Sequence, residues 1–451
     1  MSTLQDEVIH AREALVRVNG KDAAFLTMLA TDEYRLQYLE SYLDEIPQPP
    51  PISLALPLQK KPYISEGSLH PFFDNLLFEG EQLRLAEKQF GLNRRSVVDR
   101  FKLLLLTGHN TLSPVSILPM IRGEALVVDA AADPLENTRT YRLEPGYKES
   151  CSICLKISPK GDHASCRKLL WGSQRSIHME AFSEDPLNIF RSLYLGQSIS
   201  GAQRKALFSL GADKTLRRQG FPHYIIKPDG DFPEMPANEH LSMAIASELD
   251  FRVPPIGLFR IEGIGFICVI KRFDWNKKTG CQFTEDFAQI NQELAEKKDQ
   301  ARLEAIVNSI RRFTDSPTIE LAEFFRRLLF CFVIGNGDMH LKNWSLSRDE
   351  KSRLIKLAPL YDYLNVRACY PQEQVETVLP MNGKQKGLTG DDFKNFGQAI
   401  GLQENYIRNS FAQIPAWERV IKDFCSRSAL TEKLRNRYQS VVHQRVAALL
   451  R

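Results

Sequence analysis

A glycine-bearing loop that follows an apolar run carries the residues best suited to chemistry. It reads GNGDMHLKN over 335–343, so Asp338 and Asn343 stand five positions apart. At this spacing one loop can present a carboxylate that accepts a proton from a hydroxyl group and an amide oxygen that binds Mg²⁺. Phosphoryl transfer to a hydroxyl needs both groups. Asp and Asn are also common in ordinary turns, so the interpretation depends on their companions.

A second acidic residue, Asp362, lies nineteen positions after Asn343, within PLYDYLN (359–365). Its apolar and aromatic neighbours predict a partly buried carboxylate, which is costly without a partner charge. Mg²⁺ is a suitable partner, as in the Asp-Phe-Gly element of protein kinases. The alternative is a structural aspartate that caps a turn.

Lys227 ends a short β-like run, IIK (225–227). A lysine there can pair with the α- and β-phosphates of ATP, and Glu239 on the following predicted helix can hold it in place. The alternative is a solvated charge at a strand edge.

A glycine- and serine-rich segment, GQSISGAQRK (196–205), precedes this lysine. Small residues let backbone N–H groups approach phosphate oxygens, and Lys205 adds a positive charge. The segment is not a Walker A motif, because G-x-x-x-x-G-K-[ST] is absent. KRFD (271–274) leaves a β-like run and predicts a hinge whose backbone contacts adenine. The order of these features along the chain is that of a protein kinase.

Three of the eight cysteines cluster, and a histidine lies among them. Cys151 and Cys154 form one C-x-x-C pair, and His163 and Cys166 form an H-x-x-C pair after an eight-residue loop. Three thiolates and an imidazole at this spacing match a tetrahedral Zn²⁺ site, but three ordinary cysteines beside a surface histidine would give the same letters. The other five are expected to be buried thiols: Cys268, Cys281, Cys331, Cys369 and Cys425.

The elements that must position these groups divide the chain into a β-rich part and a helical part. Strands are predicted at 14–18, 52–56, 224–226 and 266–270, and helices at 80–90, 93–107, 238–249, 321–333 and 407–450. We therefore predict an α+β protein with a small N-terminal subdomain (1–145), a lobe that contains the glycine-rich loop (146–275) and a mostly helical C-terminal lobe (276–451).

Composition limits the other possibilities. The chain has 451 residues, 43% of them hydrophobic and 25% charged, which indicates a folded protein of two or three domains. A net charge of +4 is too small for a protein that binds nucleic acid along its whole surface. The acidic residues near the N-terminus and the absence of a long apolar run predict a cytoplasmic protein without a membrane partner.

Taken together, the motifs resemble the HipA-type toxin serine/threonine kinases of bacterial toxin–antitoxin systems. The similar segments are SISGAQRK (198–205), IIK, NEH (238–240), KRFD, GNGDMHLKN and PLYD (359–362), together with PISLALPLQ (51–59) and FFDNLL (72–77) nearer the N-terminus. The resemblance implies a two-lobed protein-kinase-like fold of the phosphatidylinositol-kinase type. It also implies ATP and Mg²⁺ as cofactors.

The resemblance assigns roles to individual positions. Asp338 would be the catalytic base, Asn343 and Asp362 would hold Mg²⁺, and Ser198, with Ser200 as a second hydroxyl, would be the site of inactivating autophosphorylation. The remaining residues would form the nucleotide site: Gly201, Ala202, Gln203, Lys205, Lys227, Lys271, Phe273 and His340. The cysteine segment resembles the start of short relatives that work with a separate N-terminal-subdomain protein, so the chain is interpreted as a fusion of the two.

The resemblance also implies partners: a helix-turn-helix antitoxin of the HipB type, DNA reached only through that antitoxin, and a protein substrate such as an aminoacyl-tRNA synthetase. Two alternatives remain at this point, a catalytically weak corepressor that acts with an antitoxin on DNA and a small-molecule kinase. GQSIS (196–200) also approaches the G-x-S-x-G elbow of α/β-hydrolases. Its fifth residue is Ser, and no Asp-then-His pair follows in an α/β pattern.

Overall fold

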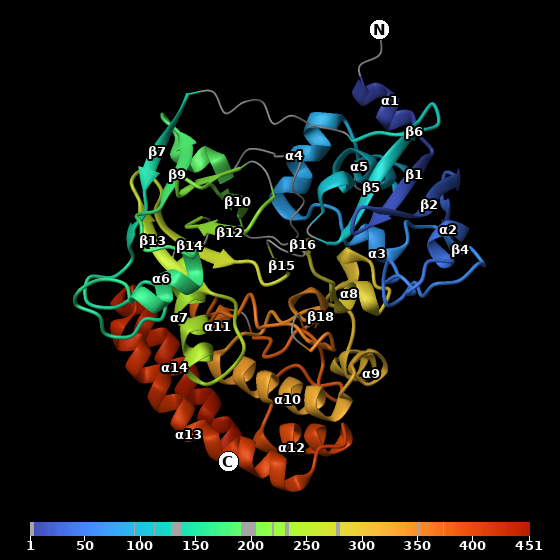
Figure 1. Cartoon of the computed structure of the whole chain (residues 1–451). Helices are drawn as coiled ribbons and strands as arrows, with labels where there is room; N and C mark the ends of the chain where they lie inside the picture. The colour runs from blue at the N-terminus through green and yellow to red at the C-terminus, as the bar shows by residue number, and fades with distance from the viewer. Residues whose placement is uncertain are drawn as a thin grey trace. The chain divides into compact units, whose positions relative to one another are not determined.

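The computed structural model describes residues 4–93, 95–111, 113–127, 137–190, 204–218, 221–230, 234–276, 280–349, 352–372 and 374–451. The chain forms two compact units, each assembled from three stretches of sequence (Figure 1). The first unit comprises Met1–Asn137, Asn188–Arg204 and Asp274–Lys298. The second comprises Thr138–Leu187, Lys205–Phe273 and Asp299–Arg451.

The first unit is built on a six-stranded antiparallel sheet with the order β4-β3-β2-β1-β5-β6. Asn19 and Gly20 join β1 to β2 with φ values of 52° and 80°, the backbone that a tight hairpin requires. The strands are β1 (Glu13–Val18), β2 (Lys21–Ala30), β3 (Glu33–Tyr38), β4 (Tyr63–Glu66), β5 (Val115–Ile121) and β6 (Glu124–Ala125).

Helices complete the core of this unit. Helix α5 begins after Ser96, whose hydroxyl accepts a hydrogen bond from the N–H of Asp99, and it buries Phe101 and Leu104 completely. Phe101 lies against Tyr34 of the sheet, with the ring centroids 5.4 Å apart. The helices are α1 (Leu4–His10), α2 (Glu40–Leu43), α3 (Pro71–Asp74), α4 (Gly80–Phe90) and α5 (Val97–Thr107).

The segment 274–298 returns to the first unit and is held by partly buried polar contacts. Glu285 Oε2 accepts a hydrogen bond from the N–H of Leu54 at 2.9 Å, and the side chain of Asn75 donates to Glu293 O at 2.8 Å. The segment contains β15 (Trp275–Asn276), β16 (Gly280–Cys281), β17 (Thr284–Asp286) and α8 (Phe287–Ile290).

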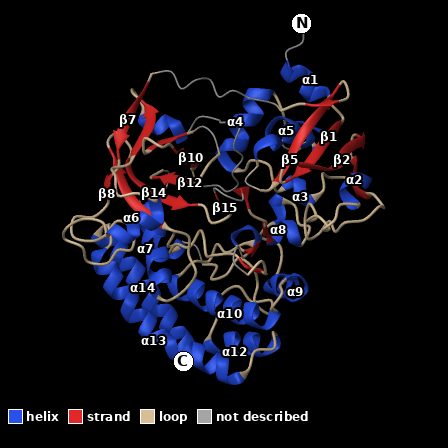
Figure 2. Ribbon diagram, viewed as in Figure 1, coloured by secondary structure: helices blue, strands red, loops and turns tan. Residues whose placement is uncertain are grey.

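The second unit begins with an eight-stranded sheet, in the order β7-β9-β11-β10-β12-β14-β13-β8. Helix α7 (Met235–Glu248) packs on β13 and β14 of this sheet (Figure 2). The strands are β7 (Thr138–Arg142), β8 (Glu144–Pro145), β9 (His178–Phe182), β10 (Ala206–Leu210), β11 (Thr215–Arg217), β12 (Tyr224–Pro228), β13 (Ile256–Ile261) and β14 (Gly265–Lys271).

The rest of the second unit is mostly helical. Helix α10, which is buried along most of its length, contacts α9 and α14, and α14 packs against α13. The elements are α6 (Ala164–Trp171), α9 (Leu303–Phe313), α10 (Pro317–Ile334), the hairpin β18 (Ser345–Arg348) and β19 (Ile355–Leu357), α11 (Val366–Cys369), α12 (Gly390–Ala399), α13 (Glu404–Arg427) and α14 (Glu432–Leu450). In the described part of the chain, no helix has both the length and the apolar character that a bilayer span needs.

The structure confirms the α+β prediction and the mostly helical C-terminal part, and it corrects three details. Residues 52–56 form a tight turn with a Ser53–Leu56 bridge, because prolines at both ends remove the donors that a strand needs. The helix predicted at 407–450 is two helices, the second begun by the side chain of Thr431. Cys281 and Cys369 are only half-buried, unlike the three other scattered cysteines.

Candidate functional site

Lys227 and Glu239 form a buried ion pair within the second unit. Lys227 lies on β12 and Glu239 on α7, and Nζ is 2.6 Å from Oε1, with the two side chains 4% and 1% exposed. Burial alone would lower the pKa of Lys227, but Asp362 and Glu239 raise it above its ordinary value. The lysine therefore carries its charge inside the protein.

Asp362 completes this group from the other side. Its carboxylate also contacts Lys227 Nζ, and its side chain remains 31% exposed. Burial would raise the pKa of Asp362, but the charges of Lys227, Lys205 and His340 hold it below its ordinary value. The backbone of Asp362 has a φ of 59°, a conformation that is uncommon away from glycine and often occurs at functional sites.

The loop that carries Asp338 and Asn343 begins where helix α10 ends. Gly335 ends the helix with a φ of 73°, and a Cβ on this residue would lie 2.6 Å from Val441. The side-chain amide of Asn343 donates to the backbone carbonyl of Asp338 at 2.8 Å, which closes the loop and leaves Asp338 exposed. The carboxylate of Asp338 is thus accessible to solvent while the backbone that carries it is held within the loop.

Further hydrogen bonds connect this loop to the segment around Asp362. The side-chain amide of Asn336 donates to the carbonyl oxygen of Asp362 at 3.3 Å, and the hydroxyl of Tyr361 donates to Lys342 O at 2.9 Å. The ring of Phe273 stacks on that of Tyr361, with centroids 6.0 Å apart. The aspartate loop (residues 335–343), the segment around Asp362 (residues 359–365) and the predicted hinge therefore form one connected region.

Lys271, a residue of the predicted hinge, already has two hydrogen-bond partners. Its N–H donates to Pro255 O at 2.8 Å within the sheet, and its Nζ donates to Leu169 O at 3.0 Å. The N–H of Lys271 is therefore unsuited to bind adenine, and a contact from this residue would have to use its carbonyl oxygen. Lys205 and His340 lie close enough to Asp362 for their charges to lower its pKa.

Most of the glycine-rich loop lies outside the described residues. This applies to the predicted nucleotide contacts of Gly201, Ala202 and Gln203 and to the two predicted phosphorylation sites, Ser198 and Ser200.

Comparison with known proteins identifies the family. Residues 197–421 match the model of the HipA-like C-terminal domain, and residues 14–118 match that of the HipA N-terminal domain. A Haemophilus influenzae protein named "Putative kinase" is 31% identical over 245 residues, which cover 47% of this chain and 69% of that protein. The chain belongs to the HipA family.

Two further comparisons cover more of the molecule. Y4mE of Sinorhizobium fredii, which carries the same kinase description, is 24% identical over 405 residues, 86% of each chain. In the solved complex of Shewanella oneidensis HipA, HipB and operator DNA, a chain matches with a TM-score of 0.68 and 16% identity over 97% of this chain and 96% of that one. The fold is thus that of HipA, which confirms the two-lobed kinase-like prediction.

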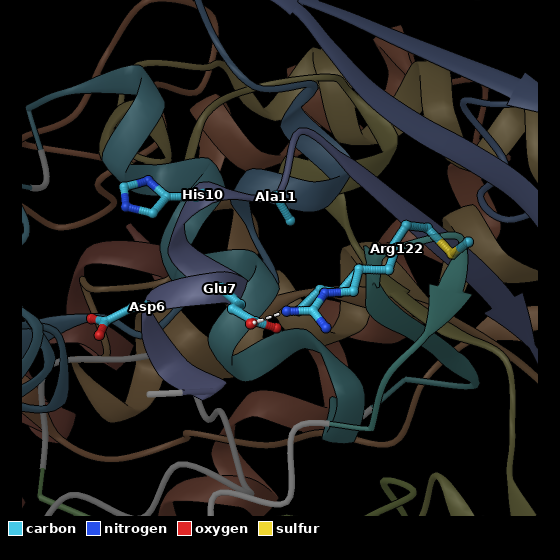
Figure 3. Close-up of a pocket in the computed structure, with 7 residues that line it drawn as sticks. Asp6, Glu7, His10, Ala11 and Arg122 are labelled. Carbon is cyan, nitrogen blue, oxygen red and sulfur yellow. Dashed lines mark hydrogen bonds and ion pairs between the residues drawn. The ribbon is translucent and has the colours of Figure 1, made fainter. Parts of the chain in front are cut away.

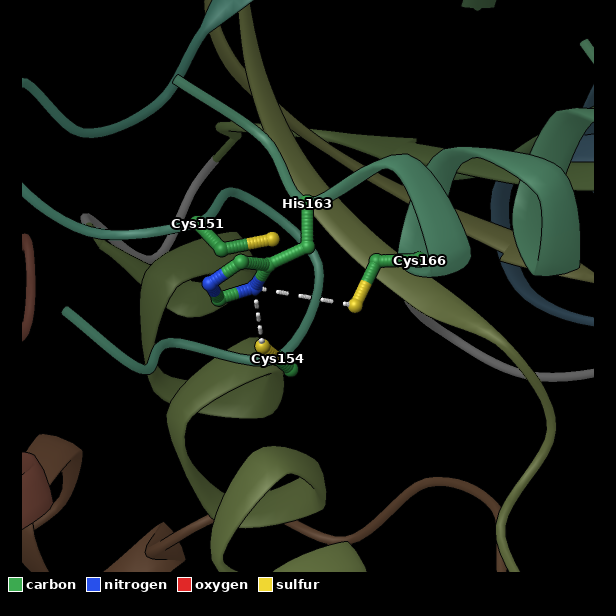
Figure 4. Close-up of side chains that lie close together, drawn as sticks. All are labelled: Cys151, Cys154, His163 and Cys166. Carbon is green, nitrogen blue, oxygen red and sulfur yellow. Dashed lines mark hydrogen bonds between the residues drawn. The ribbon is translucent and has the colours of Figure 1, made fainter. Parts of the chain in front are cut away.

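The ion pair and the aspartate loop of this HipA-family chain lie inside the C-terminal match, whereas residues 119–196 belong to neither matched segment. That segment contains the cysteine cluster. The structure brings Cys151, Cys154, His163 and Cys166 together, with all four ligand atoms within 4.8 Å of one another (Figure 4). The spacing of the sequence therefore predicted a real side-chain cluster.

A pocket also occurs in the first unit, near α1. Asp6, Glu7, His10 and Arg122 contribute to its lining, and Glu7 Oε1 lies 2.7 Å from Arg122 Nη2 (Figure 3). None of the residues that line this pocket is a predicted site residue. The charges of Glu7 and Arg122 neutralise each other.

The residues that hold helix α7 in place were not predicted from the sequence. The side chain of Asn238 exchanges two hydrogen bonds with the backbone of Asn365, and His240 bonds to Tyr147 and to the carbonyl oxygen of Ile153. Asn238 and His240 stand on either side of Glu239 in the NEH segment. Two polar residues next to the predicted partner of Lys227 are the only feature of the sequence that indicates their role. Their partners lie too far along the chain to be predicted.

Proposed function

We propose that this protein is an ATP- and Mg²⁺-dependent serine/threonine protein kinase that acts as the toxin of a toxin–antitoxin system. The observation that carries the proposal is the position of Lys227, which lies between the buried carboxylate of Glu239 and the more exposed carboxylate of Asp362. A lysine held this way is suited to bind ATP phosphates. The kinase descriptions of the relatives support the same activity.

Each residue of the site has a distinct task in this proposal. Asp338 accepts the proton of the substrate hydroxyl, and Lys227 pairs with the α- and β-phosphates. The amide oxygen of Asn343 and the carboxylate of Asp362 are the ligands for Mg²⁺, which would neutralise charge on the phosphates. Oxygen donors of this kind fit the ion. Because Glu239 is buried and Asp362 is partly exposed, Asp362 is the partner that Lys227 gives up when nucleotide binds.

Autophosphorylation of Ser198 or Ser200 would inactivate the kinase. A phosphoserine adds a charge of about −1.5 to −2, which opposes closure of the glycine-rich loop over ATP phosphates. Mass spectrometry after incubation with ATP and Mg²⁺ tests this step, and finding both serines unmodified would contradict it.

Membership of the HipA family supports a proposal for the partners of this chain. We propose that a helix-turn-helix antitoxin of the HipB type binds this chain, and that DNA is reached through the antitoxin. The matched Shewanella oneidensis structure contains HipB and operator DNA, which supports this arrangement. An aminoacyl-tRNA synthetase is the proposed substrate, so kinase action would stall translation.

Transfer of labelled phosphate from ATP to protein tests the activity. Asp338→Asn is expected to lower the rate by about 10² to 10⁴, the usual contribution of a general base. Its matched control is Asp391→Asn, which changes a carboxylate that is 82% exposed on α12 and is expected to leave the rate unchanged. Equal labelling by the wild type and the Asp338→Asn variant would overturn the proposal and favour a corepressor without kinase activity.

Phosphoproteomics identifies the substrate. Cells that express the wild type are compared with cells that express Asp338→Asn, and a synthetase phosphorylated only in the former is the expected result. Labelling of a small molecule in place of protein would show that the substrate class is wrong even though the kinase is active.

A further inference from the structure

We propose that Cys151, Cys154, His163 and Cys166 bind one Zn²⁺ ion, and that this site positions helix α7, the helix that carries Glu239. The cluster lies in the second unit, in the stretch that neither family model matches. The metal would act on structure, because a site with four protein ligands leaves no open position for a substrate.

The distances between the ligand atoms fit a tetrahedral ion. With Zn–S bonds of about 2.3 Å and Zn–N bonds of about 2.0 Å, neighbouring ligand atoms stand about 3.5 to 3.8 Å apart. Nδ1 of His163 lies 3.3 Å from Cys154 Sγ and 4.0 Å from Cys166 Sγ, and no pair of ligand atoms exceeds 4.8 Å. All three cysteines are free thiols. Small movements of the side chains would complete the coordination.

The backbone holds the first ligand pair in a tight turn. The N–H of Leu155 donates to Cys151 O at 2.9 Å, and the N–H of Cys151 donates to Lys156 O at the same distance. Leu155 is fully buried with a φ of 59°, which a leucine adopts only where the surroundings enforce it. Residues 151–156 thus form a cysteine turn with a fixed backbone.

The second ligand pair is fastened to the cysteine turn before any metal binds. His163 is the residue before the first turn of α6, and Cys166 lies in that first turn. Asp162, next to His163, accepts a hydrogen bond from the N–H of Ser152 at 2.6 Å. The two ligand pairs therefore approach each other through protein contacts, which lowers the entropic cost of binding an ion.

The cysteine turn contacts the sheet and helix α7 directly. Ser152 O accepts a hydrogen bond from the N–H of Leu258 on β13 at 2.8 Å, and Lys156 pairs with Glu248 of α7 at 2.8 Å.

His240 of α7 also contacts the cysteine turn. Its Nε2 lies 3.2 Å from the carbonyl oxygen of Ile153, between the two cysteines. Because a carbonyl only accepts, Nε2 carries the proton, and Nδ1 accepts from the hydroxyl of Tyr147 at 2.9 Å.

Three consecutive residues of α7 thus have fixed and different partners. Asn238 binds the backbone of Asn365, Glu239 binds Lys227, and His240 binds the cysteine turn. Burial lowers the pKa of His240 to about 4, so this contact is made by the neutral ring. If the cysteine turn loosens, helix α7 loses the hydrogen bond next to Glu239.

Metal analysis of the purified full chain tests the binding step. We expect about one Zn²⁺ per chain, loss of the metal in Cys154→Ser and Cys166→Ser, and full retention in Cys281→Ser, a half-buried cysteine outside the cluster. Growth with Co²⁺ provides a second readout that needs no variant, because a tetrahedral thiolate site gives intense visible absorption. A wild-type chain without metal, a chain that carries iron, or a Cys151–Cys154 disulfide would each overturn the proposal.

Hydrogen exchange tests the positioning step without using kinase activity. Removal of Zn²⁺ from the wild type is expected to speed amide exchange across Asn238–His240 by about tenfold or more and to leave α10 unchanged, and return of Zn²⁺ restores the slow rate. Tyr147→Phe removes a contact of His240 and is expected to speed exchange in α7 while Zn²⁺ stays bound. Unchanged exchange in α7 after metal removal would overturn the positioning role.

Discussion

Asn238 and Asn365 exchange two hydrogen bonds: the side-chain amide of Asn238 donates to the carbonyl oxygen of Asn365 at 3.0 Å, and its side-chain oxygen accepts the N–H of Asn365 at 2.9 Å. Both residues are fully buried. Helix α7, which packs on the sheet, is therefore fixed to the segment that follows Asp362. The same contact therefore positions both Glu239, the buried partner of Lys227, and the segment that carries Asp362.

Replacement of Asn238 should weaken both the fold and the site. Asn238→Ala leaves a buried N–H and a buried carbonyl without their partner, so the free energy of unfolding is expected to fall by about 2 to 4 kcal/mol. Urea unfolding followed by circular dichroism measures the change. Asn405→Ala, at an exposed position of α13, is the control and should leave the midpoint unchanged. Equal midpoints for the two variants would show that the Asn238–Asn365 contact contributes nothing.

Removal of the charge of Glu239 should weaken nucleotide binding. Within the described part of the chain, Lys227 of Glu239→Gln keeps only Asp362 as an anionic partner, so the lysine competes with Mg²⁺ for that carboxylate. A charge-assisted hydrogen bond contributes about 1.5 to 3 kcal/mol, which corresponds to roughly 10- to 100-fold weaker binding of ATP. Titration with a fluorescent ATP analogue measures the affinity. Glu432→Gln, at an exposed position of α14, should bind as the wild type does. Wild-type affinity in Glu239→Gln would contradict this role.

Glu285 should make the first unit less stable at alkaline pH. Burial raises its pKa from 4.5 to about 7, against the lowering effect of the Ser53 side chain and the Leu54 N–H. The folded state therefore keeps the proton up to about pH 7, whereas the unfolded state releases it near pH 4.5. The unfolding free energy should accordingly fall as pH rises through this window, by about 3 kcal/mol in total.

Chemical unfolding at pH 5 and pH 8 measures this effect. Glu285→Gln keeps a neutral side chain at both values, so it should remove most of the difference and be more stable than the wild type at pH 8. Glu262→Gln, whose side chain is 85% exposed, is the control and should preserve the wild-type pH dependence. A pH dependence that persists in Glu285→Gln would show that another group causes it.

Gly335 should tolerate no side chain, because two effects combine there. Gly335→Ala incurs about 1 kcal/mol for a residue at positive φ and also places Cβ 2.6 Å from Val441. Gly91→Ala is the matched control, since Gly91 also ends a helix at positive φ but has nothing within 4 Å of its Cβ position. We expect both variants to lose some stability and only Gly335→Ala to lose phosphotransfer, by tenfold or more, because the loop of Asp338 follows directly. Equal activity of the two variants would contradict this prediction.

The reactive groups could be predicted from the sequence because their spacing is local. Asp338 and Asn343 lie in one loop, and Cys151, Cys154, His163 and Cys166 lie within one short stretch. The order of Lys227, Glu239 and Asp362 along the chain predicted a group that the structure assembles.

The contacts that hold these groups could not be predicted in the same way. Asn238 and Asn365 are 127 residues apart, and His240 and Ile153 are 87 apart, so no local pattern links them. At residues 52–56 the alternation of apolar residues predicted a strand, but the prolines on either side and the side chain of Ser53 favour a turn. The use of the Lys271 N–H within the sheet likewise depends on Pro255, which lies on the preceding loop.

The segment 274–298 completes the first unit, so a division of the coding sequence into two genes would separate parts of that unit. A chain divided after Asn137 would leave Asp74 and Asn75 on one polypeptide and their partners, the N–H of Ala295 and the carbonyl of Glu293, on the other. Leu54 and Glu285 would be separated in the same manner. The two protein products of such a division would bind each other through this segment. The C-terminal product would carry residues 274–298, which contact the N-terminal product.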